Sequence, residues 1–308
     1  MPSKPILFAD ALIGMDVLRV VLQGAPSLSA TTPSEALAEL RESHDAFRQF
    51  VVAPPRGHQG VNACILLPPF SPGTVATAVI AGQFGYAALA GTPLIAAATA
   101  LIETGRAPAQ SNTAMFFDTA KGRQTILPVI DNGLVSSARW ETLPPKILRA
   151  EAPLTLADGR TAHASLISTG LPYAVVRAAE LGISLEDEPA VAKAGIALGA
   201  AALSALSLAD LGRTPDLDSY VTLVIGDLVA SDPPRLPVAW VSARGIVASS
   251  PGGSGALAAA AHLHQTGELP LGTSLEAVAS GATLRCGLTE EGGWVAAQTP
   301  LIAKGELL

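Results

Sequence analysis

The sequence predicts a two-domain α/β protein in which each half wraps a sheet around one central apolar helix. Its 308 residues exceed the roughly 100–200 of a single domain. Two helical segments that are apolar on every side begin about half a chain length apart, and such helices are buried. Short apolar runs bounded by Gly, Pro or Asp recur along the chain, as in sheets of short strands. We therefore expect two similar halves.

The individual elements follow from these apolar patterns. Helical periodicity and capping residues indicate the helices. The first helix begins at Thr-Thr-Pro-Ser-Glu, where a threonine can cap the helix, a proline stands in the first turn and an acid favours the positive end of the helix dipole. The predicted helices are Pro33–Phe47, Pro93–Thr104, Pro189–Leu206 and Ser254–Gln265. The predicted strands are Pro5–Ala9, Leu18–Leu22, Asn62–Leu67, Thr125–Val129, Ala174–Arg177, Val221–Ile225, Val238–Val241 and Thr283–Cys286.

The composition argues against nucleic acid, metal and membrane as partners. A net charge of −7, with 19 Lys and Arg scattered singly, does not suit a phosphate backbone. The two cysteines, Cys64 and Cys286, form neither a disulfide framework nor a zinc-binding spacing, so no metal is expected. The apolar run Ala87–Ile102 is interrupted and shorter than the roughly 20 residues of a spanning helix. The N-terminus lacks a signal-peptide pattern, so we expect a cytoplasmic protein.

Each central helix follows a turn of small residues. The first turn reads Ala90-Gly91-Thr92-Pro93-Leu94 and the second reads Pro251-Gly252-Gly253-Ser254-Gly255. Unpaired N–H groups at a helix N-terminus, reinforced by the helix dipole, bind a small anion or carboxylate. Thr92 and Ser254 add hydroxyl groups to these turns. We expect the two turns to face one ligand; the alternative is that both serve only as helix caps.

The two turns carry a resemblance to proline racemases and hydroxyproline epimerases. In that family they read Cys-Gly-His-Gly-Thr and Ser-Pro-Cys-Gly-Thr-Gly-Thr. Gly85-Tyr86 and Ala100–Gly105 are similar to the family's flanking Glu-Gly-Tyr and Ala-Leu-Val-Glu-Thr-Gly, and Pro55–His58 resembles its Pro-Arg-Gly-His motif. Asp10–Arg19 lines up with its Asp-Thr-His-Thr-Gly-Gly-Glu-Pro-Thr-Arg motif. The resemblance spans roughly Asp10 to Thr299.

The resemblance implies a diaminopimelate-epimerase-like fold of α/β (α+β) class. This fold has two pseudo-symmetric domains, each a curved, mostly antiparallel sheet wrapped around a central apolar helix, with a ligand cleft between them. We expect the first domain at residues 1–121 plus 294–308 and the second at residues 122–293. The family's reactions need no cofactor, so none is expected, and a homodimer stays open.

The sequence departs from the family at both catalytic cysteines. In the family, two thiols on opposite faces of the substrate's α-carbon remove and return a proton, and these positions hold Ala90 and Gly252 here. The family's histidine falls on Thr92, and two of its acids fall on Ala248 and Gly60. Because those acids hold the substrate ammonium, we expect a less polar ligand that keeps a carboxylate or carbonyl group.

Other side chains are candidates for the chemistry, although an unassisted hydroxyl is a poor base and is better suited to hydrogen bonding or oxyanion stabilisation. His58 is either a cleft residue or a hydrogen-bonded structural one, and Cys64 and Cys286 read as small core residues. His262 and His264 point to different faces of one helix and do not share a metal. The catalytic candidates are His58, Thr92, Ser250 and Ser254, with Asp10, Asp16 and Ser249 also at the cleft. The ligand-binding candidates are Gly91, Thr92, Ala248, Gly253, Ser254 and Gly255.

Three functions are compatible with these residues. The first is a diverged, cofactor-independent isomerase, lyase or cyclase that acts on a small, relatively apolar carboxylic acid or carbonyl compound without the two-thiol mechanism. The second is a non-catalytic, ligand-binding relative. The third is residual proline or hydroxyproline racemase or epimerase activity through substitute residues.

Overall fold

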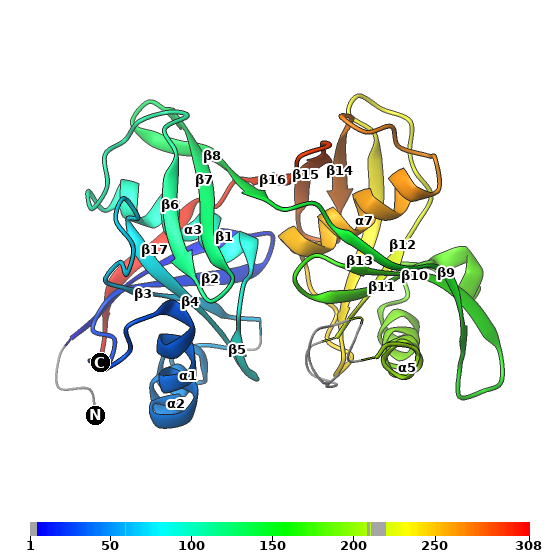
Figure 1. Cartoon of the computed structure of the whole chain (residues 1–308), viewed down its shortest axis with the longest axis horizontal. Coiled ribbons are helices and arrows are strands. Elements are labelled where there is room, and N and C mark those ends of the chain that lie inside the picture. The colour runs from blue at the N-terminus through cyan, green and yellow to red at the C-terminus, as the bar shows by residue number, and fades with distance from the viewer. Residues whose placement is uncertain (1–4, 59, 208–209, 211–219) are drawn as a thin grey trace. The chain divides into compact units, whose positions relative to one another are not determined.

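A computed structural model describes residues 5–58, 60–207, 210 and 220–308. It divides into two compact units, which we call unit 1 (Met1–Thr142 with Ala296–Leu308) and unit 2 (Leu143–Val295) (Figure 1). The first boundary lies later than the expected residue 121. The reason is that β7 (Gly122–Asp131) pairs with β6 (Met115–Thr119) in the sheet of unit 1, and β8 (Leu134–Thr142) pairs with β7.

Unit 1 contains one sheet in the order β17–β1–β2–β3–β4–β6–β7–β8, with the short β5 beside β4. The β2–β3 and β4–β6 pairs are parallel and the others are antiparallel. The remaining strands are β1 (Ile6–Ile13), β2 (Asp16–Gln23), β3 (Asn62–Leu67), β4 (Ala76–Gly82), β5 (Gly85–Ala87) and β17 (Leu301–Leu307). The helices are α1 (Pro33–Ser43), α2 (Asp45–Val52) and α3 (Gly91–Glu103).

Unit 2 contains strands in the order β9–β10–β11–β12–β13–β14–β15. Here the β11–β12 and β13–β14 pairs are parallel. The strands are β9 (Lys146–Thr155), β10 (Thr161–Ser168), β11 (Pro172–Arg177), β12 (Val221–Ile225), β13 (Arg235–Ser242), β14 (Ser274–Val278) and β15 (Thr283–Leu288), and β16 (Gly293–Ala297) contains the second unit boundary. The helices are α4 (Ala178–Leu181), α5 (Glu188–Ala205) and α7 (Gly253–Gln265).

The two units repeat one topology. Along β17–β1–β2–β3–β4–β6–β7, the pairing is antiparallel twice, then parallel, antiparallel, parallel and antiparallel. The same order recurs along β9–β10–β11–β12–β13–β14–β15. In both units the central helix comes between the fifth and sixth strands of this series. The predicted pseudo-symmetry of two mostly antiparallel sheets is confirmed.

The central helices α3 and α7 are buried within the sheets of their own units. Every residue of α3 from Gly91 to Ile102 is buried, and so is every residue of α7 from Gly253 to Leu263 except Ser254. Helix α3 contacts β1, β2, β3, β7 and β8, and α7, drawn in orange in Figure 1, contacts β10, β11, β12, β14 and β15. Alanine and glycine let the strands approach closely on all sides, as predicted for helices without a polar face.

The predicted helix Pro33–Phe47 is in fact two helices. Helix α1 ends at Ser43, and α2 begins at Asp45 after His44, whose φ of −131° lies outside the helical range. The predicted start is confirmed, because the Thr32 side chain accepts a hydrogen bond from the Glu35 N–H. No helix in the described part of the chain is long and apolar enough to cross a membrane.

Candidate functional site

The N-terminus of α7 brings together the residues of the second predicted turn. Gly252 stands directly before the helix at φ 64° and ψ 143° and accepts a hydrogen bond from the Ala256 N–H at 2.9 Å. The N–H groups of Gly253, Ser254 and Gly255 open the helix, where no intrahelical acceptor exists for them. The helix dipole adds a partial positive charge at the same place. This end of α7 therefore favours a carboxylate or a polarised carbonyl oxygen.

Behind this turn, the Ser254 hydroxyl is part of a chain of hydrogen bonds with Trp240 and Tyr173. The Trp240 indole Nε1–H donates to the Tyr173 hydroxyl oxygen at 3.2 Å, and that oxygen lies 2.7 Å from Ser254 Oγ. Because indole only donates, Ser254 Oγ is the acceptor in this chain that a hydrogen bond from the Tyr173 hydroxyl can use, and in the arrangement that pairs the Tyr173 proton, Ser254 accepts. Burial raises the pKa of the Tyr173 phenol, so it keeps that proton at neutral pH. Ser254 then has its own proton to donate to a ligand oxygen.

The N-terminus of α3 also opens with N–H groups that have no intrahelical acceptor, but the residue before the helix and the side chains that support the turn are different. Ala90 precedes the helix in extended conformation and offers no side-chain cap. Gly91 lies against the Trp140 ring, since a Cβ built on it would stand 2.1 Å from the ring atom Cε3. Trp140 is held in turn by its Nε1–H bond to Gln124 Oε1 at 3.0 Å. Thr92 is buried at the first turn, and Pro93 offers no N–H group, so Gly91 and Thr92 supply the backbone donors here.

Several residues predicted for ligand binding have internal roles in the fold. The Ala248 N–H donates to the Trp240 carbonyl at 3.0 Å. The buried Ser250 hydroxyl accepts from the Gly252 N–H at 3.2 Å and so closes the turn. A Cβ on Gly255 would lie 3.1 Å from Trp240 Cδ1, so the absence of a side chain there admits the indole ring. Of the hydroxyl groups in the second turn, Ser254 is the one that the structure prepares as a donor.

The Pro55–His58 motif forms a turn whose shape depends on Gly57. A Cβ on Gly57 would stand 2.1 Å from the Val52 carbonyl oxygen, so no other residue fits this turn. Arg56 covers the Phe50 ring at 3.7 Å from its centroid, and its Nε–H donates to the Leu308 carbonyl at 2.9 Å. The His58 side chain is exposed at the end of this turn. Whether His58 takes part in catalysis stays a prediction.

Asp10 was predicted at the cleft, but the structure places it in a buried ion pair. Its carboxylate accepts two hydrogen bonds from Arg19, Nε to Oδ1 and Nη2 to Oδ2, both at 2.8 Å. Arg19 Nη1 also donates to the carbonyls of Val51 at 2.8 Å and Arg56 at 2.6 Å. Asp10 and Arg19 are only 7% and 6% exposed. They tie the β1–β2 hairpin to the end of α2, so Asp10 has a structural role.

Asp16 places a carboxylate beside Gly60. Gly60 adopts φ 99°, and a Cβ on it would lie 3.7 Å from Asp16 Oδ1. The loss of the family's acid at this loop therefore does not leave the loop without a negative charge, which the sequence alone did not indicate.

Neither cysteine can replace the family's thiols. Cys64 and Cys286 are fully buried in β3 and β15, and burial raises the pKa of both thiols to about 12. Cys286 Sγ donates a weak hydrogen bond to the Ala256 carbonyl at 3.4 Å. Both cysteines are small core residues, as predicted. Among residues that the structure describes, no three or more His, Cys, Asp or Glu side chains gather closely enough to hold a metal ion.

The comparisons with known proteins agree with this fold. The sequence profile of the family described as proline racemase matches residues 10–303. This chain belongs to the proline racemase family. Among its members, the proline racemase of Clostridioides difficile is 25% identical over 280 residues, which cover 88% of this chain and 81% of that protein.

Two further relatives extend the comparison. The trans-3-hydroxy-L-proline dehydratase of Bacillus cereus is 26% identical over 185 residues, which cover 60% of this chain and 55% of that protein. The crystal structure of a hydroxyproline epimerase from Agrobacterium vitis, with bound trans-4-hydroxy-L-proline, has the same fold with a TM-score of 0.84. That likeness covers 100% of this chain and 94% of the epimerase at 20% identity.

Restoring a cysteine at the second turn is expected to strain the backbone. Gly252→Cys should lower the free energy of unfolding by about 1–3 kcal/mol, because φ 64° is unfavourable for a residue with a Cβ. Ala90→Cys is the matched control, since Ala90 at φ −150° already carries a Cβ. Urea unfolding of both variants measures the difference. Equal stability of the two variants would contradict the prediction.

Proposed function

We propose that this member of the proline racemase family is a cofactor-independent isomerase or lyase that acts on a small carboxylic acid or carbonyl compound without a two-thiol mechanism. The observation that carries the proposal is the Trp240–Tyr173–Ser254 chain at the N-terminus of α7. With Tyr173 donating to Ser254 Oγ, the Ser254 proton is available to a ligand oxygen, and the N–H groups of the same turn favour that oxygen as well. The named relatives, a racemase, a dehydratase and an epimerase, support this choice of reaction classes.

In this proposal the donors at α7 stabilise negative charge on the ligand oxygen as it develops. An oxygen bound by Ser254 Oγ–H and a backbone N–H is polarised, which acidifies the neighbouring carbon. Tyr173 supports Ser254 from behind, so the hydroxyl is oriented before the ligand arrives. Ala90 and Gly252 hold no proton to exchange, and the activity therefore differs from the family's thiol chemistry.

A ligand-binding protein without catalysis is the second candidate. It is favoured by the state of the cysteines, both buried with the pKa of each thiol raised to about 12. Incubation with small carboxylic acids, including proline and the hydroxyprolines, in D₂O separates the alternatives. Deuterium at the α-carbon of proline or a hydroxyproline would support residual racemisation, and loss of water or a double-bond shift in another acid would support a lyase or isomerase. Tight binding with recovery of every acid unchanged would overturn the catalytic proposal.

Removing the Ser254 hydroxyl tests the site itself. We expect Ser254→Ala to weaken binding of a carboxylate ligand roughly 10- to 100-fold, because a hydrogen bond to a charged acceptor contributes about 1.5–3 kcal/mol. Tyr173→Phe should have a smaller effect, since it removes only the support for the hydroxyl. Ser204→Ala, on the exposed surface of α5, is the matched control. Titration calorimetry with the acid that shows turnover or binding gives the comparison; equal affinity of Ser254→Ala and Ser204→Ala would contradict the site.

A further inference from the structure

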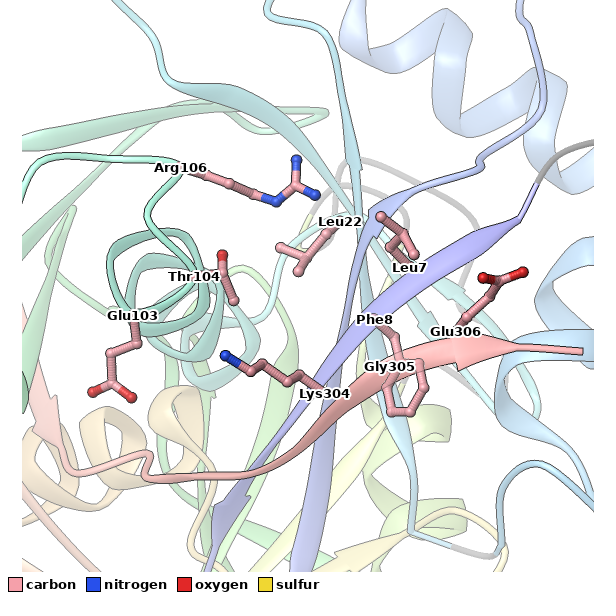
Figure 2. A pocket seen from close by; sticks show the side chains of 9 residues that line it. All are labelled: Leu7, Phe8, Leu22, Glu103, Thr104, Arg106, Lys304, Gly305 and Glu306. Atoms are coloured by element: carbon pink, nitrogen blue, oxygen red, sulfur yellow. The ribbon is translucent and has the colours of Figure 1, made fainter.

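Each unit has a hollow at the C-terminal end of its central helix, at the same place in the repeated topology. The unit 1 hollow, of about 500 Å³, lies at the end of α3 beside β1, β2 and β17 (Figure 2). The unit 2 hollow, of about 240 Å³, lies at the end of α7 beside β9, β10 and β11. In the repeat, β17, β1 and β2 correspond to β9, β10 and β11. The two hollows are therefore equivalent parts of the fold.

The two helix ends that border these hollows share the same hydrogen-bond pattern and the same following glycine. The Thr104 hydroxyl donates to the Ala100 carbonyl at 2.6 Å, and the Thr266 hydroxyl donates to the His262 carbonyl at 3.1 Å. A glycine with positive φ follows each threonine, Gly105 at 72° and Gly267 at 78°. This match pairs Ala100 with His262. It allows unit 1 to serve as an internal reference for unit 2.

The lining differs sharply between the two hollows. In unit 1, β1 and β2 contribute Leu7, Phe8 and Leu22, and β17 contributes Lys304 and Glu306, all of which Figure 2 labels. In unit 2 the corresponding strands contribute His163 and Ser165 from β10 and Arg177 from β11. Both hollows therefore have charged side chains in their lining, but on the two strands that correspond to β10 and β11 unit 1 contributes only apolar side chains. The polar side chains that β10 and β11 direct to the unit 2 hollow are thus not required by the fold.

His262 is a buried polar residue in the lining of the unit 2 hollow. Its side chain lines the hollow, and the residue is only 7% exposed. Nδ1 lies 2.9 Å from Ser165 Oγ, whereas Nε2 is buried without a hydrogen-bond partner among the described residues. Burial lowers the pKa of His262 to about 4, so the ring is neutral at physiological pH, and in the tautomer whose Nδ1–H donates to Ser165 Oγ the unpaired Nε2 is an acceptor. Leaving such a nitrogen unpaired is costly, and a ligand that donates to it would remove the cost.

The charges around His262 are predominantly negative. Glu151, Glu180 and Glu268 line the hollow, and Arg177 is the one permanent cation in the lining. Arg177 is already paired with Glu268, to which the Thr266 hydroxyl also donates at 2.8 Å. Because three carboxylates line the hollow with one permanent cation, a cationic ligand is favoured over an anionic one.

The strand pairing beside Ser165 is irregular where it borders the unit 2 hollow. Between Ala164 and Leu166 the register of β10 against β9 shifts, so that two residues of β9 face Ser165. One of them is Glu151, which adopts φ 44°, a left-handed conformation unfavourable for glutamate. A β-bulge of this kind re-aims side chains and is frequent next to functional sites. Here it coincides with the hollow that Glu151 lines.

We propose that the unit 2 hollow binds a small organic cation with N–H donors, of the amine or guanidine class. Its N–H groups would donate to His262 Nε2, with Nδ1–H donating to Ser165 Oγ, and to the carboxylates of the lining. A volume of about 240 Å³ is below the roughly 300–1,000 Å³ of pockets for drug-sized ligands, so the ligand has few heavy atoms. This second site is separate from the donors at the N-terminus of α7, because it lies at the opposite end of that helix.

Nuclear magnetic resonance of the full chain labelled with ¹⁵N-histidine tests the proposal directly. Methylguanidinium chloride is titrated at constant ionic strength, and tetramethylammonium chloride serves as a cation of equal charge without N–H donors. We expect a saturable shift of the His262 Nε2 resonance with methylguanidinium and no saturable shift with tetramethylammonium. Absence of saturation with methylguanidinium, or an equal response to both cations, would overturn the proposal.

Two matched variants locate the binding. Glu151→Gln should weaken methylguanidinium binding roughly 3- to 10-fold, because it removes one carboxylate from the lining. Glu151→Gly should weaken it similarly while relieving the left-handed strain, so a loss of binding in this variant is not a loss of folding. Glu306→Gln, in the equivalent hollow of unit 1, should leave the affinity unchanged. An equal loss in Glu306→Gln and Glu151→Gln would show that only overall charge matters and would refute the site.

Discussion

Asp10→Ala is expected to lower the free energy of unfolding by about 3–5 kcal/mol, which is among the largest effects of any single replacement in unit 1. The variant leaves the Arg19 guanidinium buried with two backbone carbonyls but no counter-charge. Urea unfolding followed by circular dichroism measures the loss.

Two comparisons show whether the ion pair is the cause. Asp158→Ala removes an exposed carboxylate paired with Arg160 and should cost less than about 1 kcal/mol. The double variant Asp10→Leu with Arg19→Met should recover most of the stability, because it removes the unpaired charge together with its partner. If Asp10→Ala were no more destabilising than Asp158→Ala, the structural role of Asp10 would be refuted.

Gly91→Ala is expected to destabilise unit 1 by about 3 kcal/mol or more, at or above the upper end for an overpacked core position. The new Cβ would stand 2.1 Å from Trp140 Cε3 and 2.6 Å from Cζ3, and neither a rigid ring nor a buried helix can yield easily. Gly255→Ala, with its nearest contact at 3.1 Å from Trp240 Cδ1, should cost clearly less. Thermal unfolding of the two variants gives the comparison.

A smaller aromatic side chain at position 140 should relieve the clash with the new methyl group. Trp140→Phe removes the part of the indole that meets the new methyl group, so Gly91→Ala should cost less in the Trp140→Phe background than in the native one. The single Trp140→Phe variant also loses the bond to Gln124 and sets the baseline. Purely additive effects would mean that Gly91 and Trp140 do not interact as the structure indicates.

The fold could be predicted from the sequence where a clear apolar run lies between turn residues, but burial alone was not sufficient, because the buried strand β4 was not predicted. Asn62–Leu67 and Val221–Ile225 coincide with β3 and β12, because both strands are buried on both faces. By contrast, β9 and β17 were not predicted. Their residues are mostly exposed, so no apolar alternation marks them.

The candidate site was only partly predictable for a related reason. Ala90 and Gly252 were expected in the small-residue turns that precede the central helices, and they stand directly before α3 and α7, since glycine turns and apolar helices are local features. Tyr173 and Trp240 were missed. They meet Ser254 through pairing between strands distant in sequence, and no local pattern records such a meeting. The same holds for Ser165 and His262, which are 97 positions apart.

The placement of Trp140 and Trp240 gives the protein built-in optical reporters. The chain has three tryptophans, and two of them lie against the opening turns of α3 and α7, at Gly91 and at Gly252 with Gly255. The third, Trp294, lies beside Gly287. With Trp294 and Trp140 changed to phenylalanine, the emission of Trp240 alone would follow the hydrogen bond to Tyr173. Occupancy of the α7 turn could then be observed as a spectral shift, without a labelled ligand and before any substrate is known.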